Sequence, residues 1–207
     1  MDNQEMLNIF VALTVISFAF SVAFAGVPSD ASFAVTFAVV LLTVGAGFVL
    51  HELAHKYTAQ HYGAFAAFRA WPVGLLVAVM TSFMGIVFAA PGAVYIFGPH
   101  LNRKQNGVIS IAGPLTNLVV ALFFAGVLFF VVPLVLASGN KEAAGMVALV
   151  GGLGYKANAW LGLFNTIPFF PFDGEKIFKW NAVVWVVLTA VLFLLVFGPA
   201  FFAGTPA

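Results

Sequence analysis

Three residues of the segment H-E-L-A-H, His51, Glu52 and His55, have types and a spacing suited to zinc chemistry. Positions four apart on an α-helix project from the same face, so both imidazoles can bind one ion. Zinc lowers the pKa of a water from 15.7 to roughly 7, and Glu52 can then act as the general base that takes the proton. The segment therefore predicts a hydrolase with His51 and His55 as metal ligands.

The alternative interpretation is that His51 and His55 are ordinary helix histidines. The chain contains only four histidines and four glutamates, so this pentapeptide rarely assembles by chance. The surrounding stretch is also apolar enough to lie in a bilayer, where ionisable groups are expensive and usually functional. Both observations favour the metal site. A catalytic zinc takes three protein ligands and keeps one open position, so the chain should hold a third ligand.

Composition places the chain among integral membrane proteins. Hydrophobic residues make up 63% of it and charged residues 7%, and its mean hydropathy is +1.09. These values lie far from those of a soluble globular domain. A net charge of +1 gives no indication of a nucleic-acid partner. Because the chain has no cysteine, a metal must rest on His, Asp and Glu side chains.

Several apolar segments are long enough to cross about 30 Å of hydrocarbon at 1.5 Å per residue. One segment, 71–97, differs because it contains two prolines and three glycines, including the pair Pro91 and Gly92. We expect it to dip into the membrane and return, or to form a hairpin. The predicted spans are 7–27, 31–57, 109–137, 143–167 and 182–203, and for the first of these a cleaved signal peptide is the less favoured alternative.

A second motif allows a family resemblance to be stated. Residues 165–174 read N-T-I-P-F-F-P-F-D-G, and with H-E-L-A-H they resemble the site-2 protease family of intramembrane zinc metalloproteases. The family's pattern N-x-x-P-x-x-P-x-D-G is matched throughout, and A-G-P-L-T-N at 112–117 is similar to the start of the family's next core helix. The resemblance implies one zinc ion held by His51, His55 and Asp173.

Elementary physics also supports a special role for the second motif. Pro168 and Pro171 prevent a regular helix, and unpaired backbone groups at membrane depth are tolerated only beside protein or a water-filled cavity. Such a break can carry the carboxylate of Asp173 into the bundle. The alternative is that Asp173 is a surface acid or the N-cap of a helix near Gly174. Rival ligands are Glu175, His61, His100, Glu142 and Asp30.

Two asparagines are further candidates. Asn165 and Asn117 can each donate an amide hydrogen bond to a substrate backbone or to a developing oxyanion, where a fixed donor is worth roughly 3 to 4 kcal/mol. The resemblance favours Asn165 for this catalytic role. For Asn117, a polar contact between packed helices is an equal alternative.

Depth and charge predict the topology. Because ligands of one ion lie at one depth, an even number of crossings must separate His55 from Asp173, so 71–97 should not cross. Five spans then place most basic residues on one side, which the positive-inside rule makes cytoplasmic, with the active site toward it. The residues on that side are Lys56, Arg69, Arg103, Lys104, Lys176 and Lys179, whereas Lys141 lies on the other.

The sequence thus predicts an all-α polytopic protein of the cell membrane. Residues 1–207 form one domain of about five to six transmembrane helices, with a three-helix catalytic core and a membrane-associated hairpin or re-entrant insert. The expected function is zinc-dependent hydrolysis of a peptide bond in or near a transmembrane segment of a membrane-anchored protein substrate. The competing hypothesis is a metal-ion transporter that uses the same His, Glu and Asp cluster, since transporters also contain broken helices and midplane acids.

Overall fold

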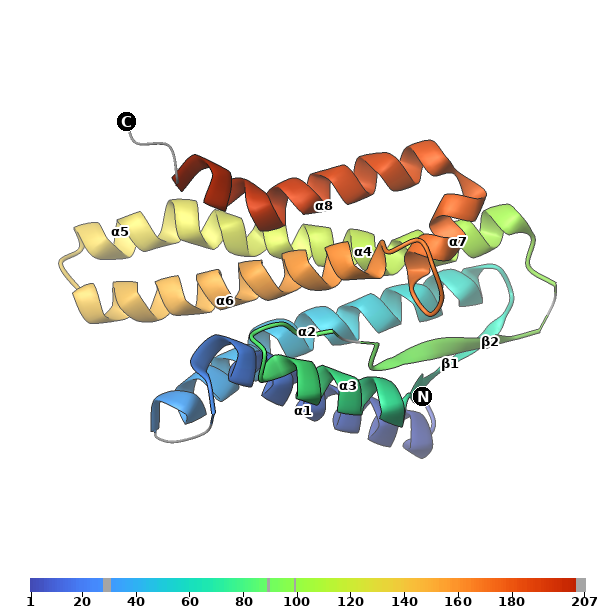
Figure 1. Ribbon diagram of the computed structural model, residues 1–207, viewed down its shortest axis with the longest axis horizontal. Coiled ribbons are helices and arrows are strands. Elements are labelled where there is room, and N and C mark those ends of the chain that lie inside the picture. Colours follow the sequence, from blue (N-terminus) through green and yellow to red (C-terminus); the bar gives the residue numbers. More distant parts are fainter. Residues whose placement is uncertain (28–30, 89, 99, 204–207) are drawn as a thin grey trace.

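The computed structural model describes residues 1–27, 31–88, 90–98 and 100–203, with side chains described up to residue 198. It is an elongated bundle whose long helices run along one axis (Figure 1). The elements in chain order are α1 (Asn3–Ala25), α2 (Ala31–His61), β1 (Phe65–Ala70), α3 (Pro72–Ser82), β2 (Gly92–Phe97), α4 (Arg103–Gly126), the π-helical turn η1 (Val127–Val131), α5 (Val132–Ala137), α6 (Lys141–Asn165), α7 (Asp173–Trp180) and α8 (Ala182–Ala203).

The all-α membrane class is confirmed. Three helical stretches are long and apolar enough to cross a bilayer, namely α1, α2 and the continuous rod from Arg103 to Ala137 formed by α4, η1 and α5. Two shorter apolar helices, Pro72–Ser82 and Ala182–Gly198, accompany them. The centre of the bundle consists of α2, α4 and α6, which pack against one another, while α1 covers α2 and α8 lies along α6.

The helix ends follow local capping chemistry rather than the limits of the apolar runs. Asn102 and Gln105 form a capping box, so α4 begins at Arg103 instead of residue 109. At the end of α2, polar residues continue the helix to His61, and Gly63 then adopts a positive φ of 77° that side chains disfavour. Helix α6 ends at Asn165, before the segment in which Pro168 excludes a regular helix.

The segment between α2 and α4 returns to the end of the bundle that it left. Strands β1 and β2 pair antiparallel, from Phe65 opposite Phe97 to Ala70 opposite Gly92. Between them, α3 has 11 residues and rises roughly 16 Å, about half of a hydrocarbon core. As a result, the end of α2, the hairpin, the start of α4, α7 and the N-terminus share one end, while the end of α8 lies toward the other (Figure 1).

A buried ion pair ties the first helix to the motif helix. Glu5 of α1 and Lys56 of α2 are 2% and 7% exposed, and Nζ lies 2.6 and 2.7 Å from the two carboxylate oxygens. The same carboxylate accepts a hydrogen bond from the backbone N–H of Phe68 in β1 at 3.2 Å. One acid therefore joins α1, α2 and β1 directly beside His55.

Replacing Glu5 with glutamine is expected to destabilise the protein by about 3 to 5 kcal/mol, because it leaves the Lys56 ammonium buried without a counter-charge. Unfolding by SDS in mixed micelles measures the difference. Glu175→Gln is the matched control, because its exposed pair with Lys179 should contribute less than about 1 kcal/mol. Equal effects of the two substitutions would contradict a structural role for the buried pair, and adding Lys56→Met to Glu5→Gln should recover stability.

Candidate metal centre

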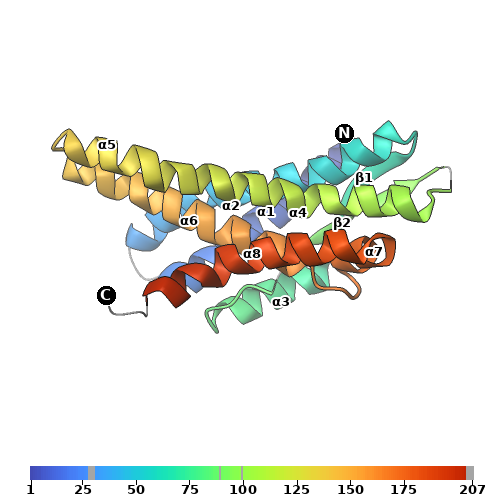
Figure 2. The same ribbon diagram turned by 90° about the horizontal axis from the view of Figure 1, so that it is seen from above.

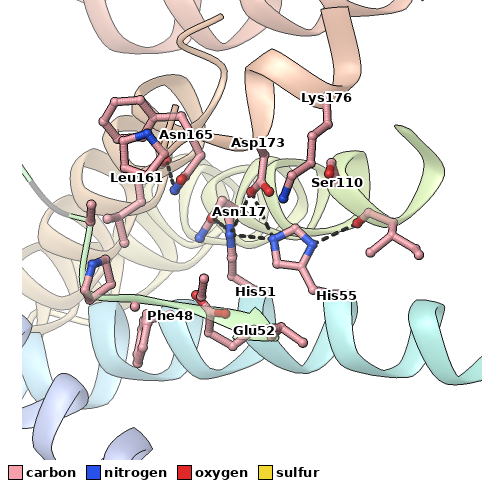
Figure 3. Close-up of a pocket in the computed structure, with 18 of the residues that line it drawn as sticks. Phe48, His51, Glu52, His55, Ser110, Asn117, Leu161, Asn165, Asp173 and Lys176 are labelled. Atoms are coloured by element: carbon pink, nitrogen blue, oxygen red, sulfur yellow. Dashed lines mark hydrogen bonds and ion pairs between the residues drawn. The ribbon is translucent and has the colours of Figure 1, made fainter. Parts of the chain in front are cut away.

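His51, His55 and Asp173 meet at one point, although Asp173 follows His55 by 118 residues. The Nε2 atoms of the two histidines are 3.0 Å apart. The Oδ2 atom of Asp173 lies 2.9 Å from Nε2 of His55 and 3.4 Å from Nε2 of His51. Figure 3 shows the imidazoles rising from α2 and the carboxylate descending from α7. Three potential ligand atoms therefore converge on one small volume.

Hydrogen bonds on the far side of each ring fix which nitrogen is free. The Nδ1–H of His55 donates to the backbone carbonyl of Ile109 in α4 at 2.8 Å, and a carbonyl can only accept. The Nδ1 atom of His51 lies 2.5 Å from Oδ1 of Asn117 on the same helix. With protons on both Nδ1 atoms, both Nε2 lone pairs point at Asp173, as metal-binding histidines require.

The arrangement fits zinc. Bonds of about 2.0 to 2.1 Å in a tetrahedral site place ligand atoms roughly 3.3 Å apart, close to the separations observed here. Two facing lone pairs and a carboxylate repel one another unless a cation lies between them. Asp173 is the one acidic group of the three, so as a carboxylate it supplies negative charge to such a cation.

Glu52 lies beside this cluster with an open acceptor. Its side chain is 6% exposed, and its Oε2 atom has no hydrogen-bond partner in the part of the chain that the structure describes. A buried carboxylate oxygen without a partner is costly, so its occurrence calls for a ligand or water at this position. Glu52 points into the cavity beside His51 and His55 (Figure 3).

The loop before α7 explains how Asp173 reaches the histidines. Helix α6 stops at Asn165, the chain turns through Pro168 and Pro171, and α7 begins at Asp173 itself. Asp173 is not the N-cap, because Phe172 occupies that position without a side-chain cap bond. The carboxylate is thus free to face α2, and the alternative of a capping acid is wrong.

Gly113 of the A-G-P segment allows the imidazoles to lie against α4. A Cβ atom at this position would overlap Nε2 of both His51 and His55. Only a residue without a side chain leaves the ligand atoms where they are. The glycine of the A-G-P motif therefore allows the α4 backbone to lie close to the metal position.

Replacing Gly113 with alanine is expected to weaken zinc binding at least as much as loss of an outer hydrogen-bond partner does, which is roughly 10- to 100-fold. The methyl group would displace the two imidazoles from the ligand point. Competition with a chelating dye measures the affinity. Gly152→Ala on α6 is the matched control, because a Cβ there meets nothing within 4 Å. Unchanged zinc affinity in Gly113→Ala would refute this packing.

The cavity around the ligands is also lined by the second strand. It has a volume of about 70 Å³, and β2 supplies Gly92, Ala93, Val94 and Ile96 to its wall. Among the described residues the sheet consists of β1 and β2 only, so one edge of β2 has no strand partner. Lys176, one turn after Asp173 on α7, and Ser110 of α4 face the same cavity (Figure 3).

The two predicted asparagines occupy different places. Asn165 lines the cavity, and its Nδ2 uses one hydrogen to donate to the carbonyl of Leu161 at 3.0 Å. Asn117 also borders the cavity, but it is 1% exposed and its amide contacts Nδ1 of His51 in α2 and Oδ1 of Asn158 in α6. Sequence reasoning missed Asn158 and the Ile109 carbonyl. A signal for Asn158 existed, because it precedes Asn165 by two helical turns in an apolar stretch.

The rival ligands lie elsewhere. Glu175 pairs with Lys179 at 2.5 Å on the outside of α7. Of the described residues, only His51, His55 and Asp173 form a group of three that could hold a metal, so His61, His100 and Glu142 are not part of one. Asp30 falls outside the described residues.

Comparisons with known proteins agree with this chemistry. A protein of Methanocaldococcus jannaschii named "Putative zinc metalloprotease MJ0611" is 37% identical over 189 residues, which are 90% of this chain and 90% of that protein. "Putative zinc metalloprotease YwhC" of Bacillus subtilis is 30% identical over 153 residues, 67% of each chain. No family model and no solved structure matches the chain. With a His, His, Asp cluster beside a glutamate and relatives of this length and identity, the chain belongs to the zinc metalloprotease family of these two proteins.

Proposed function

We propose that this protein is an intramembrane zinc protease that hydrolyses a peptide bond in or near a transmembrane segment of a membrane-anchored substrate. The observation that carries the proposal is the convergence of His51, His55 and Asp173 beside the open carboxylate of Glu52, with three of these four residues on α2, a helix apolar enough to cross a bilayer. In this respect the site is similar to that of the site-2 protease family, which the two sequence motifs resemble.

The residues divide the chemistry among them. His51, His55 and Asp173 hold the zinc ion, which when bound polarises the scissile carbonyl and acidifies a water. Glu52 takes the proton from the attacking water and keeps it inside the cavity, from which it passes to the leaving nitrogen. The second N–H of the Asn165 amide is a candidate donor to the carbonyl oxygen as negative charge develops there.

The unpaired edge of β2 suggests how a substrate is presented. A transmembrane helix satisfies its own backbone hydrogen bonds, so the scissile bond must be unwound before water can attack it. An extended substrate segment can recover those bonds by adding as a strand to β2, whose residues line the cavity. On this proposal the hairpin holds the substrate while α2 and α7 supply the catalytic groups.

The charges support a cytoplasmic active site in a multi-pass protein of the cell membrane. The end of the bundle with the hairpin and α7 carries Lys56, Arg69, Arg103, Lys104, Lys176 and Lys179, whereas Lys141 begins α6 at the other end. In Figure 2 the helices again run lengthwise, with the N-terminus in the half that holds the first end and the end of α8 toward the second. The positive-inside rule makes the first end cytoplasmic.

A combined flux and cleavage assay tests the proposal against a metal transporter. Purified protein in liposomes is given a library of single-span substrates with randomised transmembrane segments, and zinc entry is followed in parallel with a dye. We expect cleavage products, lost on chelation and restored by zinc, without zinc flux. Zinc flux without any cleavage product would contradict the protease proposal and favour the metal-transporter hypothesis.

A further inference from the structure

Behind His51 lies a chain of buried amides that connects three helices. Asn117 of α4 is 1% exposed and Asn158 of α6 is fully buried. The Nδ2 of Asn117 donates to Oδ1 of Asn158 at 3.1 Å, and Oδ1 of Asn117 faces Nδ1 of His51 at 2.5 Å. These contacts run through the centre of the bundle, where α2, α4 and α6 meet.

Two backbone carbonyls fix the direction of this chain. The Nδ2 of Asn158 lies 2.9 Å from the carbonyl of Gly154 and 3.3 Å from that of Thr43. Because carbonyl oxygens can only accept, the amide nitrogen of Asn158 must face them and its oxygen must face Asn117. Asn117 must then present its nitrogen to Asn158 and its oxygen to His51.

The orientation of the Asn117 amide affects the metal site because it determines the tautomer of His51. An oxygen at 2.5 Å from Nδ1 requires that nitrogen to carry the proton, which leaves the Nε2 lone pair directed at the ligand point. If the Asn117 amide turned over, its NH2 group would donate to Nδ1. The proton of His51 would then sit on Nε2, where it prevents metal binding.

The backbone is arranged to keep Asn158 in place. A Cβ atom at Gly47 of α2 would overlap the amide oxygen of Asn158. The Gly47 carbonyl itself lies 3.5 Å from Nδ2 of Asn117, which further favours the observed orientation. Gly47 lies one turn before His51 on α2, and the close approach of α6 at this glycine lets Asn158 reach and orient Asn117.

We infer that Asn158 is a positioning residue for the metal site, acting through Asn117 to hold His51 in the tautomer that binds zinc. The inference rests on the proposed zinc site and does not depend on the substrate. It assigns a role to a residue that lies outside both sequence motifs and contacts no metal ligand itself.

The test uses Asn158→Leu, which keeps the branched shape and removes both polar atoms. Zinc affinity is measured by dye competition on the full chain, and the His51 tautomer by nitrogen NMR of metal-free protein labelled with 15N-histidine, at a pH where the rings are neutral. With four histidines in the chain, His51 can be assigned by substitution. We expect zinc affinity to fall roughly 10- to 100-fold and His51 to acquire an Nε2–H population.

A second variant separates positioning from packing. Asn117→Asp in the Asn158→Leu background offers His51 a carboxylate, which can only accept and cannot turn a donor toward Nδ1. It should restore the Nδ1–H tautomer and most of the zinc affinity. Thr116→Val is the control, because the hydroxyl of this neighbour of Asn117 donates to the carbonyl of Ala112 in its own helix, and it should change neither readout.

Each remaining outcome overturns the inference. Wild-type zinc affinity and tautomer in Asn158→Leu would mean that Asn117 is oriented without Asn158. A fall in affinity with an unchanged tautomer, or without recovery in the double variant, would mean that Asn158 only packs the helices. Failure of the proposed protease function is distinguishable, because a wild-type protein that binds zinc but cuts nothing leaves both readouts intact.

Discussion

Glu52→Gln is expected to lower the rate of peptide-bond cleavage by at least 10² to 10⁴-fold, the usual contribution of a general base, while zinc stays bound. Glutamine preserves the shape of the side chain but cannot take a proton from water. The ligand atoms of His51, His55 and Asp173 do not depend on Glu52 for their positions, because their hydrogen bonds go to α4 and to one another.

Cleavage of a membrane-anchored substrate and zinc content, measured on the same preparations, test this expectation. Glu175→Gln is the control, because it removes an acid from the same motif region that lies outside the cavity. Loss of zinc together with activity in Glu52→Gln would assign Glu52 to the ligands instead. Full activity of Glu52→Gln would show that Glu52 is not the general base.

Asp173→Asn is expected to abolish tight zinc binding, and cleavage with it. The substitution removes the one anionic ligand and leaves two neutral imidazoles, which cannot fill a three-ligand site. The loss should exceed the roughly 10- to 100-fold cost of losing an outer hydrogen-bond partner. Equilibrium dialysis against buffered zinc gives the affinity.

Glu175→Gln again provides the comparison, since Glu175 is two residues away and pairs with Lys179. It should bind zinc as the wild type does. If Asp173→Asn kept wild-type affinity and Glu175→Gln lost it, the third ligand would be Glu175, and the short loop after Pro171 would have a different conformation in the zinc-bound protein.

The metal ligands could be predicted because short segments of sequence are enough to identify them. His51 and His55 need only a helix to share a face, and the breaks at Pro168 and Pro171 make a carboxylate such as Asp173 available. Their meeting across 118 residues was an inference from resemblance and not from physics. It is the packing of α7 against α4 that brings Asp173 to the histidines.

The features that the sequence could not predict depend on which face each helix turns toward its neighbours. Asn117 could face either a substrate or a neighbouring helix, and only the packing of α4 between α2 and α6 places it behind His51. The hairpin predicted for 71–97 begins earlier, with β1 at Phe65–Ala70. The segment F-A-A-F-R-A contains three alanines of weak β propensity, and its pairing with β2 stabilises it as a strand.

The most direct test of the central claim is to locate the cut. Purified wild-type protein is reconstituted with zinc and the single-span substrate library, and the product ends are identified by mass spectrometry, with Glu52→Gln in parallel. We expect new ends within or at the border of the transmembrane segments, formed by the wild type alone. Cuts confined to the water-exposed parts of the substrates, or the same products from Glu52→Gln, would contradict an intramembrane protease that uses Glu52 as its base.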